Sequence, residues 1–117
     1  MAEVIPFNGI LYNPEKIINL ADVATPPYDV ISKDEQLNFH KKHPYNIIRL
    51  ILGNETENDN EKNNRYTRAA GFFNEWISEE ILIRDRIPAF YITSVEFTVD
   101  GVSIKRFGLI ALVRLEP

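Results

Sequence analysis

The segment 26–29 holds the side chains with the clearest potential for chemistry: Pro26, Pro27, Tyr28 and Asp29. Two consecutive prolines fix the backbone at low entropic cost, so they would hold a phenol and a carboxylate in set positions. A rigid loop of this kind suits ligand binding or general base catalysis. The alternative is a proline-stiffened turn, in which Tyr28 packs and the Asp29 carboxylate accepts hydrogen bonds from local backbone N–H groups.

A second candidate group is Tyr45, Asn46 and Arg49. The planar guanidinium of Arg49 could bind a phosphate or a carboxylate. Alternatively, it pairs with a buried carboxylate such as Asp29 and ties two segments together. We therefore predict that both groups contribute to ligand binding, through Pro26, Pro27, Tyr28, Asp29, Tyr45, Asn46 and Arg49. The sequence assigns no catalytic residue and no cofactor.

The remaining candidates favour structural roles. His40 and His43 have a spacing that could place two metal ligands together, but no third ligand is evident, so we predict no metal site. They suit the solvated C-terminal end of a helix. Lys62, Arg65 and Arg68 form a basic stripe, which is either a solvated helix face or, less favoured, a phosphate site.

Two elements are predicted between residues 32 and 53. The run Ser32-Lys33-Asp34-Glu35 is a capping box that opens a helix to about Lys42, and a proline at position 44 prevents its continuation. The apolar run Asn46–Leu52 is rich in β-branched residues and predicts a central strand that ends at Gly53.

A polar segment from Asn54 to Asn64 predicts an exposed loop that runs into a helix with its N-cap at Asn58 or Asp59. That helix should end near Ser78. Its apolar residues recur at helical spacing and are expected in the core: Tyr66, Ala69, Ala70, Phe73, Trp76 and Ile77.

The last third of the chain carries a hairpin signature. Asp100-Gly101 predicts a two-residue type I′ turn between strands 89–99 and 102–113. The predicted register pairs Val99 with Val102, Phe97 with Ile104 and Glu96 with Lys105. The expected fold is therefore α+β, with a mostly antiparallel sheet that includes this C-terminal hairpin and about two helices packed on one face.

Composition limits the classes of protein. The 117 residues fit a single domain, and 44% hydrophobic residues can form a core without disulfides. The absence of cysteine and of a signal peptide favours the cytoplasm. A net charge of −4 argues against nucleic-acid binding, and no apolar run is long enough to span a membrane.

Several motifs, in order along the chain, are similar to those of a known family: Pro6-Phe7, Leu11–Lys16, Ala24–Ser32, His43–Leu50, Arg65–Ala70 and Arg106–Val113. The sequence resembles the N-terminal part of the family called domain of unknown function 1015. The resemblance covers essentially the whole chain, and it implies that the chain is an N-terminal fragment of a longer protein. That family in turn resembles the ParB-like superfamily, which includes nucleotide-binding proteins and free-serine kinases.

Two hypotheses follow from the resemblance. In the first, the chain is part of a nucleotide-dependent phosphotransferase acting on a small molecule, and a region after Pro117 completes the nucleotide or small-molecule site. In the second, it is a non-catalytic binding or oligomerisation module, which predicts an exposed apolar patch. An unpaired sheet edge would then favour a homo-oligomer.

Overall fold

The computed structural model describes residues 3–115, which fall into two compact units. The first unit combines the N-terminal segment up to Leu11 with the segment from Arg84 onward, and the second unit is Tyr12–Ile83. The chain passes between the units within β2 (Ile10–Tyr12) and β3 (Leu82–Arg84), which pair with each other. That the chain forms a single domain stays a prediction.

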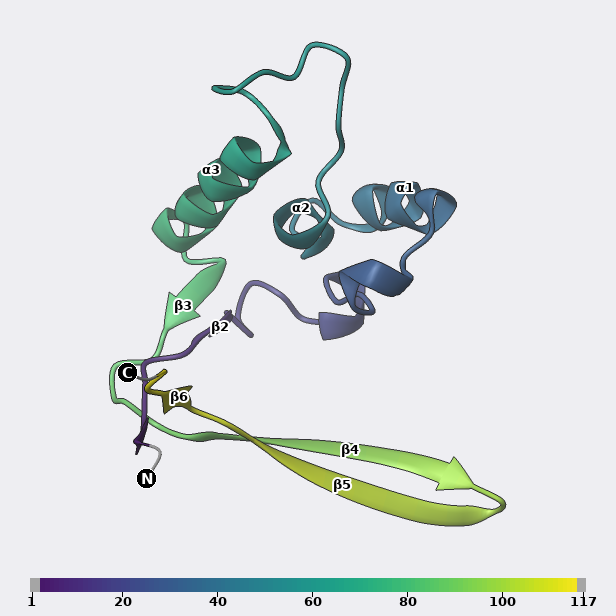
Figure 1. Ribbon diagram of the computed structural model, residues 1–117, viewed down its shortest axis with the longest axis vertical. Helices are drawn as coiled ribbons and strands as arrows, with labels where there is room; N and C mark the ends of the chain where they lie inside the picture. The colour runs from purple at the N-terminus through teal and green to yellow at the C-terminus, as the bar shows by residue number, and fades with distance from the viewer. Residues whose placement is uncertain (1–2, 116–117) are drawn as a thin grey trace. The chain divides into compact units, whose positions relative to one another are not determined.

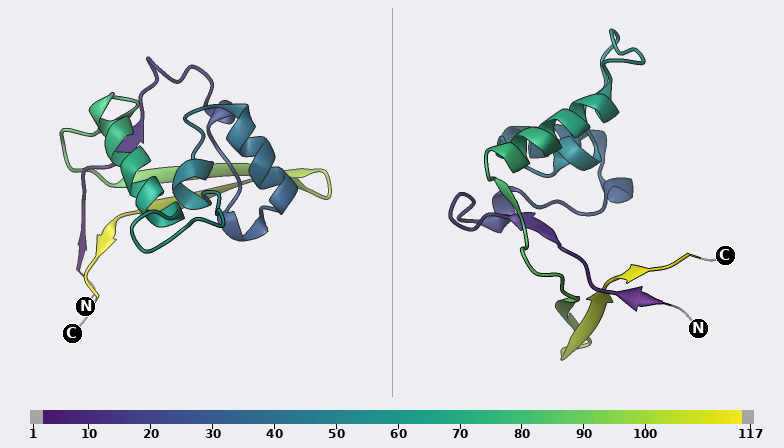
Figure 2. Two further views of the ribbon diagram at one scale, coloured as in Figure 1. Left: turned by 90° about the horizontal axis from the view of Figure 1, so that it is seen from above. Right: turned by 90° about the vertical axis from the view of Figure 1, so that its left-hand side faces the viewer.

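The second unit contains the helices α1 (Lys33–Lys42), α2 (Ile48–Ile51) and α3 (Arg65–Ser78), shown in Figure 1. It also has two short 3₁₀ turns, Leu20–Asp22 and Tyr28–Val30. α3 packs on α2, and α2 packs on α1 (Figure 2). Its core consists of six buried apolar side chains: Ile17, Val23, Ile48, Trp76, Ile81 and Leu82.

The predicted capping box of α1 is confirmed. The hydroxyl of Ser32 accepts a hydrogen bond from the Glu35 N–H at 3.2 Å, and the Glu35 carboxylate accepts one from the Ser32 N–H at 3.0 Å. These two bonds satisfy N–H groups that the first helical turn leaves without partners. α1 ends at Lys42, as predicted.

The predicted strand at Asn46–Leu52 is wrong, because this segment forms the single-turn helix α2. The side-chain oxygen of Asn46 accepts a hydrogen bond from the Ile48 N–H at 2.9 Å, which favours a helical turn over an extended chain. The Ile47 N–H donates to the Val23 carbonyl at 2.8 Å, so the turn is tied to a distant segment. These contacts outweigh the β-branched composition.

The second predicted helix exists as α3 but begins later than expected. Its N-cap is Asn64, whose side-chain oxygen accepts from the N–H groups of Tyr66 and Thr67 at 2.9 and 3.1 Å. Asp59 belongs to the preceding loop. Of the predicted core residues, Trp76 is buried, with only 2% of its surface exposed, and Ala69, Phe73 and Ile77 are partly buried. Ala70 is exposed and Tyr66 is 71% exposed, so these two are not core residues.

The first unit contains the C-terminal hairpin, β4 (Tyr91–Val99) and β5 (Val102–Ile110), visible as the long pair of strands in Figure 1. The predicted register is confirmed at all three pairs, including Glu96 with Lys105. Asp100 and Gly101 both have positive φ, 51° and 78°, as a type I′ turn requires. The short strands β1 (Val4–Ile5) and β6 (Leu112–Val113) pair antiparallel in the same unit.

The N-terminal segment contacts the base of the hairpin closely at Gly9. The Tyr91 hydroxyl accepts a hydrogen bond from the Gly9 N–H at 2.7 Å and donates one to the Asp85 carboxylate. A Cβ atom at position 9 would lie 2.5 Å from the Tyr91 ring, so a larger residue there would force the tyrosine to shift. The Phe7 ring packs on the same tyrosine, with centroids 5.1 Å apart.

The α+β class, the antiparallel pairing and the C-terminal hairpin are therefore confirmed. The strands form three two-stranded sheets, and the described residues contain three α-helices where the sequence predicted about two. None of these helices is long and apolar enough to cross a membrane.

Candidate functional site

The proline-rich segment 26–30 lies on the surface of the second unit. Tyr28 is 63% exposed, so it does not pack as the turn interpretation expected. Within residues 3–115, the Asp29 side chain has neither a hydrogen bond nor an ion pair. The segment presents a free phenol and a free carboxylate to solvent, and its role in ligand binding stays a prediction.

Tyr45 takes part in the core contacts of the second unit. Its ring packs edge-on against Trp76, with centroids 5.6 Å apart, and its carbonyl accepts a hydrogen bond from the Tyr12 hydroxyl at 2.6 Å. Burial raises the pKa of Tyr12 to about 12. The Tyr45 hydroxyl donates to the Glu79 carboxylate at 3.2 Å, and burial together with that carboxylate raises the pKa of Tyr45.

Asn46 is fully buried and uses both ends of its amide for the fold. Its oxygen accepts from the Ile48 N–H, and its NH₂ group donates to the Asp22 carbonyl at 2.9 Å. A buried amide satisfied at both ends has a structural role in this arrangement.

Arg49 binds the C-terminal end of α1. Its guanidinium donates to the carbonyls of His43 and His40 at 2.8 and 2.9 Å. These carbonyls carry the negative end of the helix dipole, which favours a cation. Among the described residues no carboxylate lies within 4.0 Å of Arg49, so the expected pairing with Asp29 is not seen.

Arg49 also borders a cavity of about 270 Å³ inside the second unit. α1, α2, the loop 53–64 and α3 all contribute to it, and it brings together three arginines and one histidine that lie apart in the sequence. Its lining residues are His40, Arg49, Gly53, Asn54, Thr56, Arg65, Arg68 and Phe72. We call it the arginine cavity.

His40 lies in the last turn of α1, as expected, and is partly exposed, but its imidazole is not fully solvated. Its Nε2 atom is buried and has no hydrogen-bond partner among the described residues. Burial lowers the pKa of His40, although the Leu52 carbonyl acts in the opposite direction, and the positive charge of Arg49 adds to the lowering. Taken together, these influences favour the neutral imidazole.

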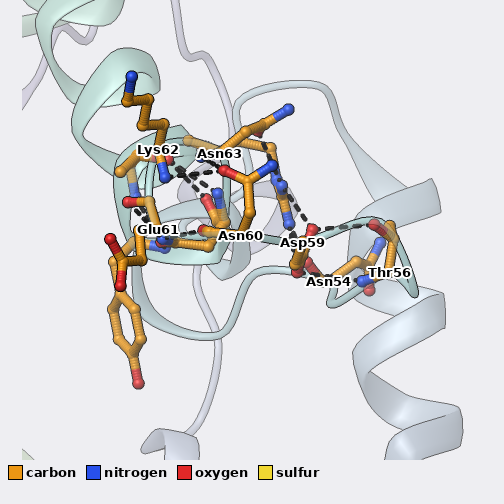
Figure 3. A network of polar contacts seen from close by, with 11 residues as sticks. Asn54, Thr56, Asp59, Asn60, Glu61, Lys62 and Asn63 are labelled. Carbon is orange, nitrogen blue, oxygen red and sulfur yellow. Dashed lines mark hydrogen bonds and ion pairs between the residues drawn. The ribbon is translucent and has the colours of Figure 1, made fainter.

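The loop 54–63 contains the polar network in Figure 3, and its residues Asn54 and Asp59 hold Arg68 in place. The Arg68 guanidinium binds both oxygens of the Asp59 carboxylate, at 2.9 and 3.2 Å, and also donates to the Asn54 carbonyl. Thr56 donates to the same carboxylate through its hydroxyl and its N–H. The bonds from Arg68 and Thr56 lower the pKa of Asp59 to about 2.

Arg65 is held more loosely. It forms an ion pair with the exposed Glu55 carboxylate at 3.1 Å, donates a hydrogen bond to the Tyr66 hydroxyl at 2.9 Å, and lies over the Tyr66 ring, 5.0 Å from its centroid. Arg65 and Gly53 also line a neighbouring cavity of about 340 Å³ that includes Tyr28. Two of the predicted ligand-binding residues, Arg49 and Tyr28, thus border adjacent cavities.

Sequence reasoning identified Arg49 but assigned Arg65 and Arg68 to a solvated helix face. The signal for a shared site was the spacing of two arginines, three residues apart, at the start of a helix. Within the described residues, no group of three or more histidine, cysteine or carboxylate side chains is arranged to hold a metal ion.

Comparison with known proteins gives one match. A family model described as protein of unknown function (DUF1015) matches residues 4–117. No curated protein and no solved structure matches the chain significantly.

Proposed function

The chain belongs to the DUF1015 family, and within that family we propose that this domain is a non-catalytic assembly module whose β4–β5 hairpin packs against the hairpin of a second copy. The observation that carries the proposal is the exposure of apolar side chains along the hairpin. On one face they are Ile92, Phe107 and Leu109, and on the other they include Val95, Val99 and Val102.

An isolated two-stranded hairpin is at best marginally stable in water, and contiguous exposed apolar surface commonly marks a binding interface. β4 and β5 each pair only with one another within the described residues. A partner that covers one face would therefore stabilise the hairpin as well as bind it.

The face that carries Phe107 is complementary to itself. In the hairpin register, Phe107 lies opposite Ser94 and Glu96 lies opposite Lys105. A two-fold axis parallel to the strands would place β4 of one copy over β5 of the other, with register partners at the same height. Phe107 would then lie over the small Ser94 of the second copy, and Glu96 over its Lys105.

The remaining pairs on this face fit the same arrangement. Ile92 and Leu109 are register partners and would form apolar contacts between the copies, while Thr98 and Ser103 would meet as hydroxyl pairs. The charge pattern agrees, because the charged residues on this face are Glu96 on β4 and its register partner Lys105 on β5.

Sedimentation velocity across a range of protein concentrations tests the proposal. The chain should form dimers, and Phe107→Ser should shift the equilibrium to monomers. Val102→Ser is the matched control, since Val102 is 61% exposed against 66% for Phe107 but lies on the opposite face. A monomeric chain, or equal weakening by both variants, contradicts the proposed interface.

A charge exchange tests the predicted orientation. Lys105→Glu would oppose Glu96 both within one hairpin and between copies, and should weaken the dimer. Combining it with Glu96→Lys restores both contacts and should restore dimerisation. Failure of the double variant to recover would contradict the two-fold arrangement.

The second candidate is part of a nucleotide-dependent phosphotransferase that acts on a small molecule. It is supported by the adjacent cavities at Arg49 and Tyr28, with Asp29 exposed beside the latter. A nucleotide that binds only the folded chain should raise its melting temperature by mass action. Asp29→Asn and Arg49→Lys should reduce that rise, and no rise with any nucleotide argues against this candidate.

A further inference from the structure

We propose that the arginine cavity of the second unit is a binding site for a small oxyanion, a phosphate or a carboxylate group. The inference does not depend on self-association, because every residue that it uses lies within Tyr12–Ile83.

The first observation is the positive charge at the cavity. Arg49, Arg65 and Arg68 line it, whereas their two carboxylate partners, Glu55 and Asp59, do not. Three guanidinium groups against two carboxylates leave one positive charge. The excess lies at Arg49, whose described partners are neutral carbonyl oxygens. The negative end of the α1 dipole offsets about half of this positive elementary charge.

The second observation is independent of charge. His40 also lines the cavity, and its Nε2 atom, which is closed off from solvent and so from the open part of the cavity, has no hydrogen-bond partner among the described residues. An unsatisfied buried polar atom costs about 1–3 kcal/mol, so such groups generally meet a ligand or an ordered water. After a small rotation of the ring towards the cavity, the tautomer that carries its proton on Nε2 can donate one uncharged hydrogen bond to an oxyanion.

Arg49 also keeps N–H donors that have no described partner. The bonds of Arg49 to the two carbonyls leave its Nε and one hydrogen on each terminal nitrogen without a described partner. Arg65 is the most easily redirected group, because its ion pair with Glu55 and its hydrogen bond to the Tyr66 hydroxyl are made to exposed partners, and exposed ion pairs contribute little to stability. By contrast, Arg68 is fixed by Asp59 and forms a rigid wall.

The size of the cavity limits the ligand. About 270 Å³ is slightly below the roughly 300–1,000 Å³ of pockets that enclose drug-sized molecules. It accommodates a phosphate or carboxylate group with a few further atoms. Phe72 provides an apolar surface against which the carbon atoms attached to the phosphate or carboxylate can pack.

Titration of the full chain with inorganic phosphate tests the site, with chloride at matched ionic strength as the reference and acetate as the carboxylate probe. Imidazole NMR resonances are the readout, because the chain has only two histidines. The His40 signals should shift. Those of His43, whose Nδ1 accepts from the Tyr45 N–H at 3.0 Å, should not. A larger response to one anion identifies which oxyanion the site prefers.

Three variants make the test specific. Arg65→Met and His40→Leu should each weaken phosphate binding about tenfold or more, as expected for hydrogen bonds to a charged ligand. His40→Leu should keep or raise the melting temperature, since it removes an unsatisfied buried nitrogen. Lys62→Met removes an equal charge from an exposed neighbour that does not line the cavity, and should leave binding unchanged.

Two results would overturn the proposal. One is the absence of any His40 shift with phosphate or acetate, which would mean that water alone satisfies the imidazole. The other is an equal loss of binding in Lys62→Met and Arg65→Met, which would reduce the effect to general surface charge.

Discussion

Replacing Asn46 by alanine tests whether this residue serves the fold or a ligand. The change removes the acceptor of the Ile48 N–H and the donor to the Asp22 carbonyl. The N–H is buried and the carbonyl is partly buried, so leaving both unsatisfied should cost about 2–4 kcal/mol of unfolding free energy. A loss of that size is a large part of the stability of a small domain.

Urea denaturation followed by fluorescence measures this effect directly. Trp76 is the chain's single tryptophan and lies in the core of the second unit, so its emission reports on that unit. With a denaturant slope of about 1.5 kcal/mol per molar urea, the midpoint should fall by about 1–3 M.

Asn74→Ala is the control, because Asn74 is exposed on α3 and alanine favours a helix there. Its midpoint should stay the same or rise slightly. If Asn46→Ala changes the unfolding free energy by less than about 0.5 kcal/mol, the structural role of Asn46 is refuted.

Three further changes have outcomes that the contacts define. Gly9→Ala should destabilise the first unit by about 1–3 kcal/mol, because the new Cβ would lie 2.5 Å from the Tyr91 ring and would displace the tyrosine. Loss of protection of the residue-9 amide in hydrogen exchange would show this effect, and the same protection as in the unchanged chain would contradict it. Ser32→Ala should lower the free energy of unfolding by about 1 kcal/mol, because it removes the cap of α1, and urea denaturation measures this loss. An unchanged free energy of unfolding would mean that the capping box adds nothing to stability. The pKa of Asp59 is lowered to about 2, so the stability contributed by its bonds with Arg68 should be present above about pH 4 and lost as the pH falls towards 2. Asp59→Asn should lack this part of the dependence of unfolding free energy on pH. The same acid profile for the variant and the unchanged chain would contradict the assignment.

Local signals made part of the fold predictable from sequence. The capping box at Ser32 and the Asp100-Gly101 turn each involve residues that are neighbours in the chain. The hairpin register follows from its turn, because a two-residue turn fixes every later pair. Predicting such elements requires no knowledge of contacts between residues that are far apart in the chain.

α2 was not predictable in the same way. An apolar, β-branched run of this length fits a strand or a buried helical turn equally well. The choice depends on bonds from Asn46 to Asp22 and from Ile47 to Val23, partners that are about two dozen residues away in the chain. Only the folded unit reveals that these segments meet.

The arginine cavity required the same kind of information. Arg49 was identified as a candidate from its residue type, but the loop before α3 brings Arg65 and Arg68 to it. The Asp59 network that orients Arg68 is made by a segment that the sequence indicated only as polar and exposed. A histidine at a helix end gave no sign that its Nε2 would be buried.

The pairing of β1 with β6 has a consequence for the order of folding. Val4 pairs with Val113, and the whole second unit lies in the sequence between the two halves of the first. The second unit needs only its own continuous segment, whereas the first must close a long loop, whose entropic cost rises with its length. During synthesis from the ribosome, Trp76 should therefore become buried before the N-terminal strand finds its partner.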